Sequence, residues 1–146
     1  MTTPARIPLL SVEDARAAAA TAGVPELVAD LSVFRLWLHH PRLARWLSDL
    51  IMGMLGEGRL DARLRELAIM RVGWVTHADY EWTQHWRIAL GLGVPEDDLL
   101  GVRRWPDYEG FGPAERAVLA AVDETLAEGT IGALGWAACI EHVSDD

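Results

Sequence analysis

Apolar residues recur at intervals of three and four along nearly the whole chain, and this spacing constrains the fold more than any other feature. The interval matches the turn of an α-helix, which takes about 3.6 residues, and no stretch shows the sustained alternation of a half-buried strand. Glycine and proline divide the pattern into segments of helix length. We therefore predict an all-α helical bundle that forms a single domain over residues 1–146.

Capping and breaking residues predict where the helices begin and end. Ser11 and Asp14 have the spacing of a capping box, and Pro41 is suited to the first turn of a helix. The third helix should use Leu43, Trp46, Leu47 and Leu50 as its apolar face. Residues 1–10 are expected to form an extended arm. The helices predicted in this way cover residues 11–23, 26–39, 41–51, a segment that begins at Asp61, and residues 77–90, 95–102, 112–129 and 131–142, with a polar tail at the end.

Composition excludes several classes of partner. No apolar run approaches the roughly 20 residues of a membrane span, and the first residues do not resemble a signal peptide, so we expect a cytoplasmic protein with no membrane contact. The net charge is −9 and the 13 basic residues are scattered, which argues against nucleic acid. Cys139 is the only cysteine, so no internal disulfide or thiolate zinc cluster can form. We expect Cys139 to be a small apolar core residue.

A carboxylate interrupts the apolar face of the helix that Asp61 is expected to cap. Glu66 lies among residues that should all face the core, namely Leu64, Leu67, Ala68, Met70 and Val72. A buried acid must be paired or become protonated. Possible partners are Arg63, Arg65 and Arg71. Glu66 is therefore either part of a structural ion pair or a group that transfers protons.

Thr76 and Asp79 have the spacing of a second capping box, which predicts a helix from about His77 through Leu90. Residues four apart share a helix face, so His77 should lie in line with the next two ionisable residues of that face, Glu81 and His85.

This face allows several interpretations. His85 is either a buried histidine that is hydrogen-bonded to Glu81, or a group that acts in proton transfer. A metal site formed by His77, Glu81 and His85 is conceivable, but three ligands on one straight helix rarely converge on a single ion. We therefore predict no metal and no cofactor.

Four motifs, in the same order and at natural spacing, resemble the carboxymuconolactone decarboxylase and alkylhydroperoxidase D-like family. The resemblance covers about residues 34–136 and implies an all-α bundle that assembles into trimers, hexamers or related rings. It also implies a site where a pair of helices meets a neighbouring subunit. The motifs are Phe34-Arg35 with His39-His40-Pro41, Arg63-x-Arg65-Glu66-Leu67-Ala68-Ile69, Tyr80-Glu81-Trp82-x-x-His85, and Glu115-Arg116-Ala117-Val118-Leu119.

The redox cysteines of the family's peroxidases are absent, because Ala78 and Glu81 occupy the two positions. Alanine has no thiol to ionise, so we do not expect peroxidase activity. The resemblance places the family's glutamate on Glu66 and its histidine on His85. What remains is similar to the decarboxylase members, which act on a lactone that carries a carboxylate.

The resemblance therefore implies acid-base catalysis on a small carbonyl or lactone compound, by decarboxylation or related lyase or isomerase chemistry. We expect His85 to act as the acid, Glu66 as its orienting partner or base, and Glu81 as a second base. The residues expected to contact the substrate are His77, Tyr80 and Trp82.

Two alternatives remain open. The protein is a binding or structural homologue that has lost catalysis, or it is a subunit whose site a partner completes. The second is suggested by the C-terminus, which is short relative to the family after Trp136. In either case we expect a homo-oligomer, as a dimer, trimer or hexamer. An apolar pocket that holds Glu66 and His85 within hydrogen-bond reach would favour the enzyme, and a filled cavity would favour a non-catalytic homologue.

Overall fold

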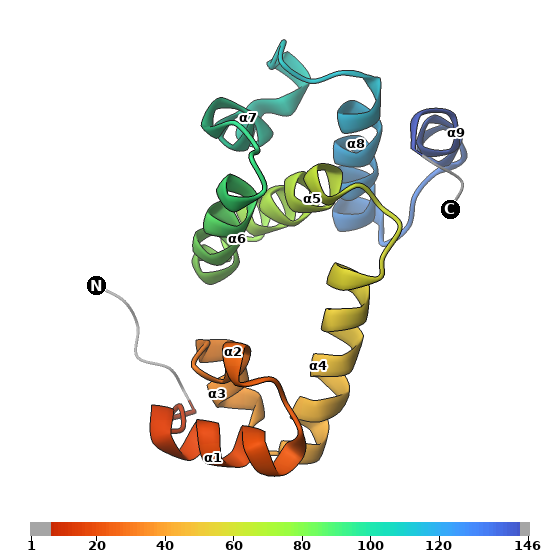
Figure 1. Cartoon of the computed structure of the whole chain (residues 1–146). Helices are drawn as coiled ribbons and strands as arrows, with labels where there is room; N and C mark the ends of the chain where they lie inside the picture. Colours follow the sequence, from red (N-terminus) through yellow and green to blue (C-terminus); the bar gives the residue numbers. More distant parts are fainter. Residues whose placement is uncertain (1–6, 144–146) are drawn as a thin grey trace. The chain divides into compact units, whose positions relative to one another are not determined.

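A computed structural model gives the structure of the chain and describes residues 7–143. Within this range the regular structure is helical and contains no strand, which confirms the all-α prediction (Figure 1). The contacts divide the chain into two compact units, with the boundary between Gly58 and Arg59. Each unit has a hydrophobic core of its own. A single domain over the whole chain stays a prediction.

The described part of the first unit, residues 7–58, contains four helices, and the first of them begins and ends where the sequence predicts. The backbone N–H of Asp14 donates to the Ser11 hydroxyl oxygen at 3.0 Å. Gly23 closes the helix with a φ of 73°, a left-handed conformation that suits glycine. The helices of this unit are α1 (Val12–Ala22), α2 (Glu26–Ala29), α3 (Ser32–Trp37) and α4 (Pro41–Gly56).

The single helix predicted over residues 26–39 is wrong, because the chain forms α2 and α3 with a break between them. Leu31 has an extended conformation, with φ −66° and ψ 136°. The Asp30 carboxylate just before it accepts a hydrogen bond from Arg16 Nε of α1 at 2.8 Å. The contact joins the break to another helix, and periodicity alone does not reveal it.

The predicted apolar face of α4 is present, but it does not face the core of the first unit. The side of α4 that faces the core carries Ala44 and Ser48, both 0% exposed. Small residues allow α4 to pack closely on α1, whose buried residues are alanines. Large apolar side chains therefore lie on the surface of α4. They are Leu43, Trp46, Leu50 and Met54, while Leu47 is half-buried.

Part of the predicted N-terminal arm is described. Residues 8–10 are non-helical and bind α3 and the turn after it. Arg35 Nε donates to the carbonyl oxygen of Leu10 at 2.7 Å, and His39 Nε2 lies 2.8 Å from the carbonyl oxygen of Pro8. Residues 1–6 of the arm and residues 144–146 of the predicted polar tail lie outside the described residues.

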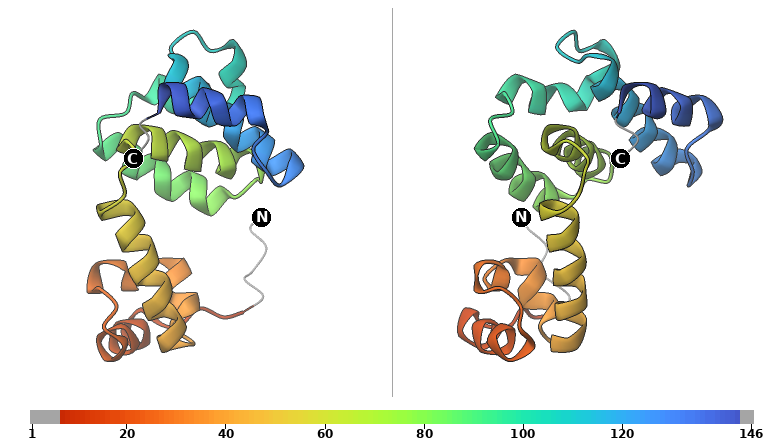
Figure 2. Two further views of the ribbon diagram at one scale, coloured as in Figure 1. Left: turned by 90° about the vertical axis from the view of Figure 1, so that its right-hand side faces the viewer. Right: turned by 45° about the vertical axis from the view of Figure 1, so that its right-hand side comes forward.

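The second unit is built around α5, which packs against α6 on one side and α8 on the other (Figures 1 and 2). The last helix, α9, packs on α8. The helical segments of this unit are α5 (Ala62–Val75), α6 (Asp79–Gly91), α7 (Glu96–Gly101), the 3₁₀ helix η1 (Val102–Asp107), α8 (Pro113–Glu128) and α9 (Ala133–His142). Its core consists of Leu67, Met70, Ala89, Val94, Leu99, Val102, Phe111 and Leu119.

Two predicted helix ends of this unit are confirmed. The Asp61 carboxylate accepts from the backbone N–H of Leu64 at 3.1 Å and so caps α5. Gly129 ends α8 with a φ of 73°. The segment between the helices predicted over residues 95–102 and 112–129 is in part the 3₁₀ helix η1.

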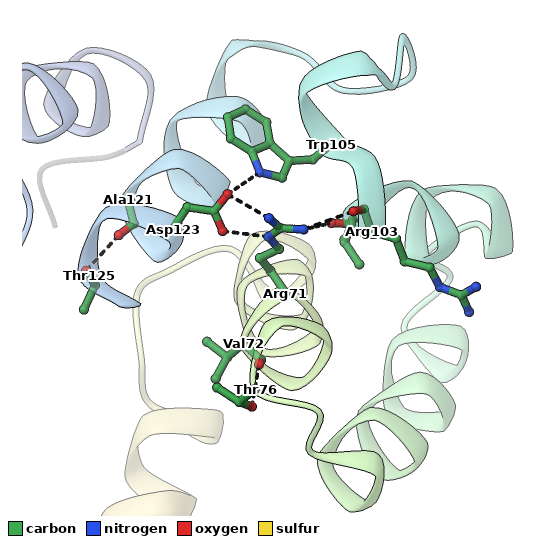
Figure 3. Close-up of polar contacts among 9 residues, drawn as sticks. Arg71, Val72, Thr76, Arg103, Trp105, Ala121, Asp123 and Thr125 are labelled. Atoms are coloured by element: carbon green, nitrogen blue, oxygen red, sulfur yellow. Dashed lines mark hydrogen bonds and ion pairs between the residues drawn. The ribbon is translucent and has the colours of Figure 1, made fainter. Parts of the chain in front are cut away.

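An arginine of α5 joins three elements of the second unit (Figure 3). Arg71 donates from Nε and a terminal nitrogen to the two carboxylate oxygens of Asp123 on α8, at 2.7 and 2.9 Å. Its other terminal nitrogen donates to the carbonyl oxygens of Val102 and Arg103 in η1, at 2.8 and 3.2 Å. Trp105 Nε1 donates to Asp123 at 2.8 Å. These bonds fix the position of α5, the helix that carries Glu66.

Candidate functional site

Glu66 is buried on α5 with 0% of its surface exposed. Of the three arginines predicted as partners, only Arg65 pairs with it, with Nε 3.1 Å from Oε1. Arg63 instead pairs with Asp98 and Glu115, and Arg71 pairs with Asp123. The prediction that the buried acid must be paired is confirmed, and one oxygen is left for a second partner.

That second partner is His85 on α6, whose Nδ1 lies 2.7 Å from Glu66 Oε2. The other ring nitrogen, Nε2, lies 3.6 Å from Oε2 of Glu81, one turn earlier on the same helix. The imidazole therefore lies between two carboxylates. Only 14% of the His85 side chain is exposed, against 48% of the Glu81 side chain. The hydrogen bond of His85 is made with Glu66, and Glu81, which was expected to be its partner, lies at ion-pair distance from the other ring nitrogen.

Glu66 is ionised at neutral pH. Burial by itself raises the pKa of this carboxyl, but hydrogen bonds and charges from His85 and Arg65 outweigh burial and hold the pKa below its ordinary value. An ionised carboxylate only accepts hydrogen bonds, so His85 Nδ1 carries a proton and donates a hydrogen bond to Glu66. The other ring nitrogen, Nε2, faces the half-exposed Glu81 and not the core.

The capping box predicted at Thr76 is wrong. The Thr76 hydroxyl donates back to the carbonyl oxygen of Val72 at 2.7 Å and completes α5 (Figure 3). Helix α6 begins at Asp79, and its N-cap Ala78 has no side chain that could cap it. His77 lies in the turn between the helices with a φ of 55°. It therefore does not lie in line with Glu81 and His85 on one helix.

The three residues expected to contact substrate are only partly brought together. His77 and Trp82 line one small cavity of about 100 Å³, together with Gly73, Trp74 and Asp79. Tyr80 is half-buried and is not among the lining residues. Within residues 7–143, no group of three histidine, cysteine or acidic side chains is arranged to hold a metal ion.

Sequence analysis missed an aromatic and basic cluster beside His85. Trp82 packs against Trp74 and Trp86, with ring centroids 5.7 and 5.9 Å apart. The guanidinium carbon of Arg103 lies 4.9 Å from the ring centroids of both Trp74 and Trp82. The spacing of Trp82 and Trp86, four apart on a helix, is a signal for their shared face. No local pattern indicates that Arg103 of η1 joins them.

Cys139 is half-buried, and its thiol donates to the carbonyl oxygen of Ala117 at 3.7 Å. Burial and the charge of Glu124 raise the pKa of this thiol, which disfavours the reactive thiolate. Cys139 lines an almost entirely apolar cavity of about 330 Å³ between α5, α8 and α9. Its surroundings are those of an apolar packing residue.

The sequence pattern that defines the carboxymuconolactone decarboxylase family matches residues 41–124, which include Glu66, Glu81 and His85. The chain belongs to this family. Comparisons with curated proteins and with solved structures each found no match. Within the described residues, no helix is both long enough and apolar enough to cross a membrane.

Proposed function

We propose that the protein is an enzyme that acts on a small carbonyl or lactone compound by acid-base chemistry without a cofactor. The reaction is a decarboxylation or a related lyase or isomerase step. The observation that carries this proposal is the position of His85, with one ring nitrogen bonded to buried Glu66 and the other facing half-exposed Glu81. A histidine oriented by one carboxylate, with its second nitrogen free to react, is suited to proton transfer.

The three residues take different roles in this proposal. Loss of carbon dioxide leaves an electron pair on the substrate carbon, and that carbon must take up a proton. His85 Nε2 delivers this proton, and Glu81 exchanges protons with solvent because half of its side chain is exposed. Glu66 is fully buried and does not reach substrate, so it is a positioning residue that fixes the tautomer of His85.

One observation favours the alternative of a non-catalytic homologue. Glu66 and His85 line neither the apolar cavity nor the small cavity at His77. Arg65 also completes an ion pair with Glu66, and a structural network would have the same appearance. In that case His85 and Glu66 would serve only to hold α5 against α6.

A partner copy of the chain would reconcile the two observations. Exposed apolar residues lie on α4, and a second group lies on α9: Leu134, Trp136 and Ile140. Exposed apolar residues that are grouped on one helix are typical of a protein–protein interface. We propose a homo-oligomer in which a neighbouring subunit helps to close the substrate site.

The test is a screen for carbon dioxide release from β-keto acids and from small lactones that carry a carboxylate. The proposal predicts turnover that falls about a hundredfold or more in His85→Gln. His142→Gln is the matched control, because His142 Nε2 lies 3.9 Å from Glu141 outside the site. Equal rates in wild type and His85→Gln would contradict the proposal. No turnover by the wild type, with only stability lowered in His85→Gln, would favour the non-catalytic homologue.

A further inference from the structure

The cluster of tryptophans and arginines on α6 and η1 borders an open cavity of about 390 Å³. This cavity lies within the second unit and does not include Glu66, Glu81 or His85. Its lining residues are Trp82, Thr83, Trp86, Arg87 and Arg103. Two tryptophans and two arginines therefore line one cavity.

The two arginines of this cavity have no acidic partner. Within residues 7–143, neither Arg87 nor Arg103 forms an ion pair with a carboxylate, although the chain has 22 acidic residues against 13 basic ones. Other arginines of the chain do pair with carboxylates: Arg16, Arg45, Arg63, Arg65 and Arg71. Two arginines without a carboxylate ion pair thus lie at one cavity.

Arg103 is held in a position that leaves its hydrogen-bond donors available. Its backbone carbonyl accepts from Arg71 at 3.2 Å, and its guanidinium extends away from Arg71 (Figure 3). The guanidinium rests on the rings of Trp74 and Trp82. A cation-π contact uses none of the five N–H donors of arginine, so these donors can still bind an anion.

We propose that this cavity binds a small aromatic carboxylate. A guanidinium group matches a carboxylate with two parallel hydrogen bonds, and Arg87 and Arg103 supply two such groups. The faces of Trp82 and Trp86 can stack on a flat apolar ring. The cavity thus offers both halves of the recognition, charge for the carboxylate and aromatic surface for the ring.

This binding site does not depend on proton transfer by Glu66 and His85. A ligand here would contact α6 and η1, the element whose position Arg71 fixes. Binding is therefore expected in a protein with no catalytic activity at all. The measured quantity is a dissociation constant rather than a rate.

The test is isothermal titration of the full chain with naphthoate, with naphthamide as the uncharged control and cyclohexanecarboxylate as the non-aromatic control. We expect saturable binding of naphthoate, and binding at least about tenfold weaker for both controls. Arg87→Gln and Arg103→Gln should each weaken naphthoate binding by about tenfold to a hundredfold, the range for a lost charge-assisted hydrogen bond. Arg87 is exposed, so its substitution keeps the test valid if Arg103→Gln does not fold.

The matched control is Arg42→Gln, because Arg42 also rests on a tryptophan, with Cζ 4.7 Å from the Trp46 ring centroid, but lies in the first unit. It should bind naphthoate as the wild type does. The proposal is overturned if naphthoate shows no saturable binding, if naphthamide binds equally well, or if Arg42→Gln weakens binding as much as Arg87→Gln does. The last result would mean that naphthoate binding depends only on the overall charge of the protein.

Discussion

His85 Nδ1 of α6 and Glu66 Oε2 of α5 are 2.7 Å apart, and the carboxylate of this pair has no exposed surface. A buried charge is stable only when it is paired and hydrogen-bonded. Arg65 binds the other oxygen of Glu66, so the acid has a partner on each side. The α5–α6 contact therefore includes a polar link whose geometry determines which nitrogen of His85 carries the proton.

The first prediction is that Glu66 makes the free energy of unfolding depend on pH in the acidic range. Its pKa in the folded protein lies below the ordinary value of 4.5. A lowered pKa stabilises the folded state at pH values above the unfolded pKa, and this contribution is lost as the pH falls through the folded pKa. The difference in unfolding free energy between wild type and Glu66→Gln should thus be largest near neutral pH and shrink below about pH 4.5.

Urea unfolding of both proteins across this pH range measures the difference. The hydrogen bond from Arg16 also lowers the pKa of Asp30, but Asp30 is present in both proteins. Its contribution therefore cancels in the difference. A difference that stays constant or grows as the pH falls would mean that Glu66 is not ionised in the folded state.

Helical periodicity was enough to predict the all-α fold and the burial of Glu66, because both depend on residues three and four apart. The break at Leu31 and the exposure of the apolar side of α4 were not predictable in this way. Both involve contacts between helices: Arg16 with Asp30 in one case, and close packing of small residues in the other.

The site, like the fold, was predictable only where it depends on local sequence patterns. The Glu66 and His85 positions follow from motifs, whereas the place of His77 depends on how α5 ends. Thr76 has the residue type of an N-cap, but its hydroxyl bonds backward to Val72. Arg103 comes from a separate element, so only the structure reveals its contact with the tryptophans of α5 and α6.

The second prediction concerns the Arg71–Asp123 pair. Asp123→Ala removes the carboxylate partner of Arg71, which is 13% exposed, and the acceptor of the Trp105 N–H. We expect it to lower the unfolding free energy by about 2–4 kcal/mol. Asp49→Ala is the matched control, because Asp49 and Arg45 are also 2.7 Å apart but are 56% and 46% exposed. Asp49→Ala should lower the unfolding free energy by only about 0–1 kcal/mol. Equal losses in the two variants would contradict the structural role of Arg71.

The third prediction is that Asp98 controls the ionisation of Tyr108. The Tyr108 hydroxyl donates to Asp98 Oδ1 at 2.6 Å, and this hydrogen bond, with burial and nearby acids, raises the pKa of Tyr108 to about 12. The contribution of Tyr108 to stability is therefore present below its unfolded pKa of 10.0 and lost as the pH rises through about 12. In Asp98→Asn the pKa should fall toward 10.0.

Tyrosinate absorbance measures this pKa in a Tyr80→Phe background, which leaves Tyr108 as the only tyrosine. Asp107→Asn is the control for a change of charge nearby. If the Tyr108 pKa is the same in Asp98→Asn as in the Tyr80→Phe parent, Asp98 does not control the ionisation of Tyr108.

The fourth prediction is that the chain assembles through the exposed apolar side of α4. Light scattering should give a mass that is a multiple of 16.1 kDa at micromolar concentration. Trp46→Asp, which places a charge on this side, should shift the mass toward that of one chain. Leu27→Asp changes an exposed leucine on α2 and should leave the mass unchanged. A wild-type monomer would refute the prediction.

The most direct test of the Glu66–His85 relationship is nitrogen-15 NMR of the histidine rings at neutral pH. We predict that Nδ1 of His85 is protonated, and that its proton exchanges slowly and shows the strong downfield shift of a hydrogen bond to a carboxylate. In Glu66→Gln, which lacks the charge, that proton signal should move upfield or disappear, while in Glu141→Gln it should not change. If Nδ1 of His85 is unprotonated in the wild type, or if Glu66→Gln leaves the signal where it was, then Glu66 does not orient the ring and the proposed proton transfer loses its basis.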